Sequence, residues 1–147
     1  IENIDAHTNK VMTILDLQTG EIAATVMMKT FEFEKSLMQE HFNENYVESE
    51  KFPKAVFRGK IENFNKLDLS KDGKNSVNIS GEITIHGVTQ ALKCEATLSK
   101  KANSIRASTS FPIEVADFDI EIPKVVFYNI AEIVEVKLSF SYQPLNP

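Results

Sequence analysis

The fold is decided by "SVNISGEITIHGVTQALKCEATL", residues 76–98, because apolar and polar side chains alternate along both of its arms. In the first arm Val77, Ile79 and Ile83 fall on one face, with polar residues between them. A period of two is typical of a β-strand with one buried face and one exposed face. The arms meet at a turn in which Gly87 can take a positive φ. The stretch therefore predicts a β-hairpin.

The same alternation continues outward from this hairpin on both sides. Residues 11–28 predict a second hairpin, and single strands are predicted after Pro53, at residues 105–111 and at residues 134–142. Short antiparallel strands joined by tight turns must pack as a sandwich or close into a barrel to protect their edges. The sequence therefore predicts one all-β domain over residues 1–147.

One segment has the periodicity of a helix instead. Between residues 33 and 43, Leu37 and His41 are four residues apart, and so are Met38 and Phe42. Spacing of this kind predicts a short amphipathic helix whose apolar side faces the protein. We expect these four side chains to face inward and the acidic residues that follow them to face solvent.

A second segment, residues 111–131, also departs from the alternation. Pro112 and Pro123 limit strand pairing there, and bulky aromatic residues follow. We expect irregular structure that covers one end of the sheet.

Composition narrows the class of protein. The 147 residues are 42% hydrophobic and 25% charged, with a formal net charge of -5. This balance is typical of a globular protein and argues against nucleic-acid binding, which requires a concentrated basic surface. No apolar run approaches the roughly 18 to 20 residues of a membrane span. The chain begins at Ile1 rather than Met, as expected of a processed or trimmed end.

Candidate catalytic and metal-binding residues are few. Cys94 shares a strand face with Leu92, which predicts a buried and unreactive thiol. His41 and Glu44 form the single plausible local ligand pair, and two ligands make a poor metal site. His86 is interpreted as a residue that hydrogen-bonds its own turn. No catalytic residue, metal or cofactor is predicted, although a metal-linked or haem-linked enzyme using His41 stays an alternative.

Two glycines occupy positions where a core side chain is expected. Gly59 and Gly81 each lie on the apolar face of a strand. Glycine there allows a bulge or sharp bend that helps to close a barrel. Alternatively, it leaves room inside the barrel for an apolar ligand, and the two interpretations are compatible.

Two motifs in order carry a resemblance to a known family. The first is His41 and Phe42, followed by Phe52 and Pro53 and then by Phe57. The second is "GEITIHGVT" at residues 81–89. Together they resemble the YceI-like family, lipocalin-like β-barrel proteins associated with polyisoprenoids and other long apolar lipids.

The resemblance implies an antiparallel, lipocalin-like β-barrel of about eight strands with one short helix near one end. Most family members are exported to the bacterial periplasm, which is therefore the expected location. The family also has strand sequence before the position of Ile1, so the first barrel strand is expected to be missing or truncated here.

The implied function is the non-catalytic binding, transport or storage of an isoprenoid or other long apolar lipid inside the barrel. We expect no nucleic-acid partner, and a transient membrane contact and a homodimer are compatible with this function. The expected wall residues are Phe57, Ile61, Ile79, Ile83, Leu92, Leu98, Phe111, Val136, Leu138 and Phe140. The residues expected near an entrance are Met38, His41, Phe42 and Phe118. The alternative is a stress-response or interaction protein with a solid barrel and no ligand.

Overall fold

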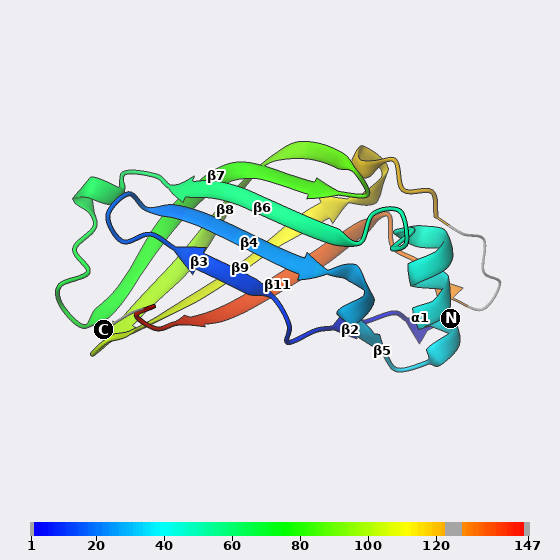
Figure 1. Cartoon of the computed structure of the whole chain (residues 1–147), viewed down its shortest axis with the longest axis horizontal. Helices are drawn as coiled ribbons and strands as arrows, with labels where there is room; N and C mark the ends of the chain where they lie inside the picture. The colour runs from blue at the N-terminus through cyan, green and yellow to red at the C-terminus, as the bar shows by residue number, and fades with distance from the viewer. Residues whose placement is uncertain (1, 123–127, 146–147) are drawn as a thin grey trace.

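A strongly curled antiparallel sheet forms the body of the protein (Figure 1). The structure, a computed structural model, describes residues 2–122 and 128–145. Within these residues seven strands pair in the order β11-β9-β8-β7-β6-β4-β3. Their bounds are β3 Met12–Leu15, β4 Glu21–Met27, β6 Lys54–Ile61, β7 Gly73–Ile85, β8 Val88–Lys101, β9 Ser104–Glu114 and β11 Ile133–Tyr142. The prediction of an antiparallel, all-β, barrel-like fold is confirmed.

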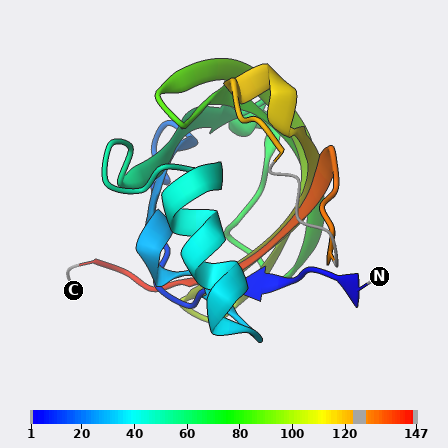
Figure 2. The same cartoon turned by 90° about the vertical axis from the view of Figure 1, so that its right-hand side faces the viewer.

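Shorter elements complete the described residues. β1 (Glu2–Asn3) pairs in parallel with β10 (Tyr128–Asn129), and β2 (Ala6–His7) pairs antiparallel with β5 (Glu32–Phe33). Single 3-10 turns are η1 Met28–Thr30, η3 Phe64–Lys66 and η4 Val115–Phe118. Helix α1 (Ser36–His41) continues as the π-type turn η2 (Phe42–Tyr46), and Figure 2 shows this helical segment lying across one end of the curled sheet.

Among the described residues, none of the helices combines the length and the apolar character needed to cross a membrane.

The hairpin predicted from residues 76–98 is the centre of the sheet. β7 and β8 pair from Gly73 opposite Lys100 to Ile85 opposite Val88. The connecting turn is tight, with φ angles of 54° at His86 and 73° at Gly87. Two successive left-handed residues are typical of a two-residue hairpin turn whose twist matches that of the strands.

Gly59 and Gly81 lie directly opposite each other in the β6–β7 ladder. A Cβ built on Gly81 would meet the carbonyl oxygen of Arg58 and the Cα of Gly59. One built on Gly59 would meet the Phe57 ring and, at 2.6 Å, the carbonyl oxygen of Ser80. Backbone and an aromatic ring therefore fill the space beside both glycines, which supports the interpretation that they allow a sharp bend of the sheet.

The two edge strands of the sheet, β3 and β11, meet through side chains. Within the described residues no backbone ladder joins them. A hydrogen bond of 2.7 Å between Thr13 Oγ1 and Tyr142 Oη spans this seam near one end. The barrel is thus closed by pairing around its circumference except along one seam.

The buried apolar residues form two clusters, one toward each end of the sheet. The helical-end cluster consists of Met28, Val47, Phe111, Ile113, Val115, Phe118 and Ile120. The far-end cluster consists of Ile61, Val77, Ile79, Ala96, Leu98 and Ile105. Cys94 is partly buried and packs against both clusters, in keeping with its predicted place on the inner face.

The expectation of irregular structure from residue 111 onward is wrong for its first four residues. β9 continues through Pro112, which lies opposite Glu135 of β11. The β8–β9 ladder ends at Thr109, so this part of β9 has β11 as its single ladder partner. Proline fits there because its missing N–H is not required by a second neighbour. Turn η4 follows, and Pro123 lies outside the described residues.

The helix prediction needs two corrections. The helical segment begins three residues later than expected, at Ser36, because residues 32–33 form β5. Leu37 does not face the protein but is 52% exposed, whereas Met38 is buried. A helix turns by about 100° per residue, so the two neighbours cannot both face the barrel.

Candidate functional site

The inner face of the sheet brings together all ten predicted wall residues. They alternate with exposed polar residues along five strands, which is the pattern of a barrel interior. Phe57 and Ile61 come from β6, Ile79 and Ile83 from β7, Leu92 and Leu98 from β8, Phe111 from β9, and Val136, Leu138 and Phe140 from β11.

Burial along this inner face is uneven. Ile61 and Leu98 in the far-end cluster are 0% and 1% exposed. By contrast, Ile83, Leu92 and Leu138 are only partly buried although they point inward. Several inward-facing apolar side chains toward the helical end are therefore not fully covered by the protein.

Two shallow depressions lie elsewhere. One, of about 270 Å³, is lined by Glu62, Asn78, Ile79, Lys93, Cys94 and Glu95. The other, of about 500 Å³, is lined by Ser76, Glu95, Ala96, Thr97, Ser108, Thr109, Ser110, Lys137 and Leu138. Most of these side chains belong to the exposed polar face of the sheet. Neither depression coincides with the predicted apolar site.

Aromatic rings gather where the helical segment meets the barrel. The Phe42 ring lies 5.9 Å from Phe31, 4.9 Å from Phe33 and 5.9 Å from Tyr46, measured between ring centroids. Phe42 and Tyr46 both pack against the helical-end cluster. Burial raises the pKa of Tyr46 to about 12, so its hydroxyl keeps its proton and can donate a hydrogen bond.

Of the predicted entrance residues, Met38, Phe42 and Phe118 lie at this end and His41 is placed differently. Met38 and Phe118 are buried, and Phe118 belongs to the helical-end cluster. His41 is partly exposed, and its Nδ1 lies 3.3 Å from Asn45 Oδ1, one turn along the helical segment. The contact between His41 and Asn45 therefore lies along the helical segment and does not point into the barrel.

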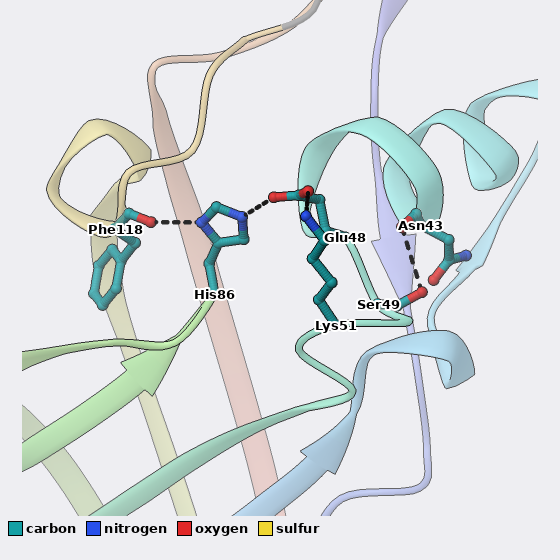
Figure 3. A network of polar contacts seen from close by, with 6 residues as sticks. All are labelled: Asn43, Glu48, Ser49, Lys51, His86 and Phe118. Atoms are coloured by element: carbon teal, nitrogen blue, oxygen red, sulfur yellow. Dashed lines mark hydrogen bonds and ion pairs between the residues drawn. The ribbon is translucent and has the colours of Figure 1, made fainter.

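A polar network at the same end was missed by sequence reasoning (Figure 3). His86 was expected to hydrogen-bond its own turn, but its ring contacts two other segments instead. Glu48 was expected to face solvent, but it is one of these two partners. His86 Nε2 lies 2.5 Å from Glu48 Oε2, and His86 Nδ1 lies 2.9 Å from the carbonyl oxygen of Phe118. The positive φ of His86 directs its side chain across the end of the barrel.

The loop that carries Glu48 is fixed by its own hydrogen bonds. The Ser49 amide donates to the carbonyl oxygen of Asn43, and the Phe52 amide donates to that of Glu48. The Phe52 ring packs edge-on against the His86 ring at 4.7 Å. Gly87 permits this contact, because a Cβ there would overlap the Phe52 ring. The local signal for the network was the pairing of a turn histidine with glycine, but nothing local pointed to Glu48, 38 residues away.

Among residues 2–122 and 128–145, no three side chains of His, Cys, Asp or Glu lie close enough together to hold a metal ion. Glu44, the residue that the sequence paired with His41 as a poor candidate metal site, is exposed.

These features define a lipocalin-like barrel with an apolar interior and a helical segment across one end. The YceI-like domain family matches residues 2–142, and the chain belongs to this family. No curated protein sequence matches the chain significantly.

Solved structures share the fold at low sequence identity. The Campylobacter jejuni YceI protein is 14% identical, with a TM-score of 0.76 over 99% of this chain and 88% of that one. A polyisoprenoid-binding domain from Saccharophagus degradans, implicated in plant cell wall breakdown, is 13% identical, with a TM-score of 0.79 over 96% and 91%. Burkholderia cenocepacia BcnA is 16% identical, with a TM-score of 0.73 over 91% and 83%.

Proposed function

We propose that this protein binds a long apolar lipid of the isoprenoid type inside its barrel, and carries or stores it without chemical change. Support comes from membership of the YceI-like family and from the Saccharophagus degradans neighbour, which is described as a polyisoprenoid-binding domain. The observation that carries the proposal is the partial exposure of inward-facing apolar residues such as Ile83, Leu92 and Leu138.

The physical reason is burial of apolar surface. Each Å² of apolar surface removed from water stabilises a complex by roughly 25 cal/mol. The part of the interior that would cover a lipid chain is the helical end, where Ile83 of β7, Leu92 of β8 and Leu138 of β11 are partly buried. Tyr46 is a candidate donor to a polar group at the end of such a lipid.

A chain-length series tests this proposal. Lipid-free protein is titrated with isoprenoid alcohols of increasing length, and binding is followed by calorimetry. The dissociation constant should fall with each added isoprene unit and level off once the interior is filled, with a negative heat-capacity change. Absence of binding, or affinity independent of chain length, would contradict the proposal.

The location of the protein belongs to the same proposal. We propose that the protein acts outside the cytoplasm, where a carrier of apolar lipid would meet membranes. The support is membership of the YceI-like family. Fractionation of the native cells would test the location.

A further inference from the structure

One imidazole at the helical end joins segments that are far apart in the sequence. We use the word cap for residues 36–53, which comprise α1, η2 and the loop that follows. His86 of the β7–β8 turn contacts Glu48 of the cap at 2.5 Å and the Phe118 carbonyl oxygen of η4 at 2.9 Å (Figure 3). The His86 side chain is 11% exposed, so little water can substitute for either partner. The ring therefore ties the cap to η4.

Both partners of the ring are hydrogen-bond acceptors. A carbonyl oxygen can only accept, so Nδ1 has to carry a hydrogen, and a carboxylate places the same requirement on Nε2. A neutral imidazole carries one hydrogen, not two. Both hydrogen bonds can therefore form at once only if the pair of His86 and Glu48 carries one proton more than a neutral imidazole and an ionised carboxylate together. The pKa of Glu48 is lowered, chiefly by its hydrogen bond with His86, which favours the ionised carboxylate and places that proton on the ring.

We propose that Glu48, His86 and the Phe118 carbonyl form a proton-dependent latch that holds the cap against η4. The latch is closed while the ring carries both hydrogens. Loss of one leaves a bare ring nitrogen facing an acceptor, and the cap shifts away from η4. Histidine is the side chain whose unperturbed charge change falls between about pH 5 and 8, so this is the range in which the latch is tested.

The other groups around the ring are few. Lys51 of the cap places Nζ 3.5 Å from Glu48 Oε1, on the side of the carboxylate away from the ring. On η4, Asp117 is exposed, and so is Asp119, the residue after Phe118. From β8, Gln90 Nε2 donates to the Asp117 carbonyl oxygen at 2.8 Å. This last bond holds η4 to the sheet. Val47 of the cap packs in the same buried cluster as Phe118, so opening is a shift of the cap and not its detachment.

Backbone strain favours opening once the ring loses a proton. Glu48 has a φ of 50° and His86 a φ of 54°. Residues other than glycine are disfavoured in this left-handed region and stay there only when their surroundings hold them. The φ of His86 belongs to the β7–β8 turn and stays when the latch opens, whereas that of Glu48 lies in the cap loop and can relax. That opening admits or releases a lipid rests on the proposed function, whereas the latch itself does not.

The test measures the cap directly in lipid-free protein. Spin labels are placed on cysteines introduced at the exposed positions Glu44 and Ala116, with Cys94 replaced by Ser. In the otherwise wild-type protein, a longer cap-to-η4 distance should grow at least about tenfold in population between pH 5.5 and pH 8.5, as expected for loss of a hydrogen bond to a charged group. Nitrogen NMR of His86 should show hydrogens on both ring nitrogens at pH 5.5.

Two variants and one control separate a latch from an ordinary contact. Glu48→Gln should stay closed at both pH values, because the amide can donate to a bare Nε2 and accept from a protonated one. His86→Asn, which tolerates the positive φ, should lose the pH response. His7→Asn is the control, because His7 also faces a glutamate, Glu32 at 3.3 Å, but both side chains are largely exposed. It should respond like the wild type.

Three results would overturn the latch. They are a wild-type distance that does not change with pH, a Glu48→Gln variant that is open at both pH values, and a ring with one bare nitrogen at pH 5.5. A latch that opens as described in a protein that binds no lipid would count against the proposed function alone.

Discussion

At the scale of single residues, the backbone approach at Gly59 and Gly81 is what lets the sheet curl. A side chain at either position would displace the neighbouring strand or the Phe57 ring. The Phe57 ring covers Gly59 from the inside, so the apolar lining stays continuous where the backbone has no side chain.

Gly81→Ala should therefore destabilise the protein. Its Cβ would press against the Arg58 carbonyl, and overpacking of this kind costs about 1–3 kcal/mol. Urea denaturation at neutral pH provides the measurement. Glu82→Ala, at the next and exposed position, should change the free energy of unfolding far less. Equal effects of the two substitutions would mean that the backbones of β6 and β7 are not in close contact at Gly81.

Glu48 gives a second prediction at this scale, on the acid side. Because the pKa of Glu48 is lowered in the folded protein, its contribution to stability is present above the ordinary glutamate range. That contribution is lost as pH falls through the folded-state value. The stability difference between wild type and Glu48→Gln should therefore be largest near pH 6 and shrink toward pH 3.

Denaturation midpoints between pH 3 and 6 measure this difference. Glu44→Gln is the matched control, since Glu44 is an exposed glutamate of η2. A difference for Glu48→Gln that is constant over the whole range would show that the carboxylate charge has no part in it.

At the scale of elements, the seam between β3 and β11 is the weakest part of the barrel. A hydrogen bond between the side chains of Thr13 and Tyr142 crosses this seam. Burial raises the pKa of the Tyr142 hydroxyl, which therefore keeps its proton. The seam thus depends on side chains, whereas every other junction of the main sheet is a backbone ladder.

Tyr142→Phe should cost about 1 kcal/mol, the usual net value of one hydrogen bond. Thr13→Val should cost a similar amount, and the double variant should cost less than the sum, because both remove the same bond. Urea denaturation gives the free energies, and hydrogen exchange should rise first in β3. Fully additive effects would mean that the two residues do not interact.

Elements also show what the sequence could predict. Strands follow from period-two alternation, which is local, so both hairpins could be predicted. The β3–β4 hairpin was placed within two residues, whereas β7 begins at Gly73 and β8 ends at Lys101, three residues beyond each end of the predicted stretch. The orientation of Leu37 was wrong because four apolar residues were assigned to one face of a short helix. The prediction that Pro112 would end the strand was wrong because β9 has no ladder partner on its β8 side beyond Thr109. The end of that ladder cannot be read from the local sequence.

The same distinction applies to the candidate site. The place of the ten residues on the inner face could be predicted because they repeat with the strand period, and their contact with a lipid stays a prediction. The contact between Glu48 and His86 could not, because it joins a loop to a turn 38 residues away and depends on two left-handed backbone angles.

At the scale of the whole molecule, the two clusters leave a position between them where the interior can be blocked. Ala24 of β4 lies opposite Phe57 and shares the inner face with Ile22 of the far-end side and Val26 of the helical-end side. Its neighbour Ala23 is exposed on the outer face. The two alanines allow the same substitution to be made inside and outside the barrel.

The most direct test of lipid binding is the mass of lipid that the protein releases. Wild type, Ala23→Trp and Ala24→Trp are purified without detergent from lipid-containing cells, checked for cooperative unfolding, and compared by native mass spectrometry before and after organic extraction. We predict that wild type and Ala23→Trp carry an extractable apolar lipid and that Ala24→Trp carries much less. An empty wild-type protein, or equal lipid in both tryptophan variants, would contradict a lipid bound inside the barrel.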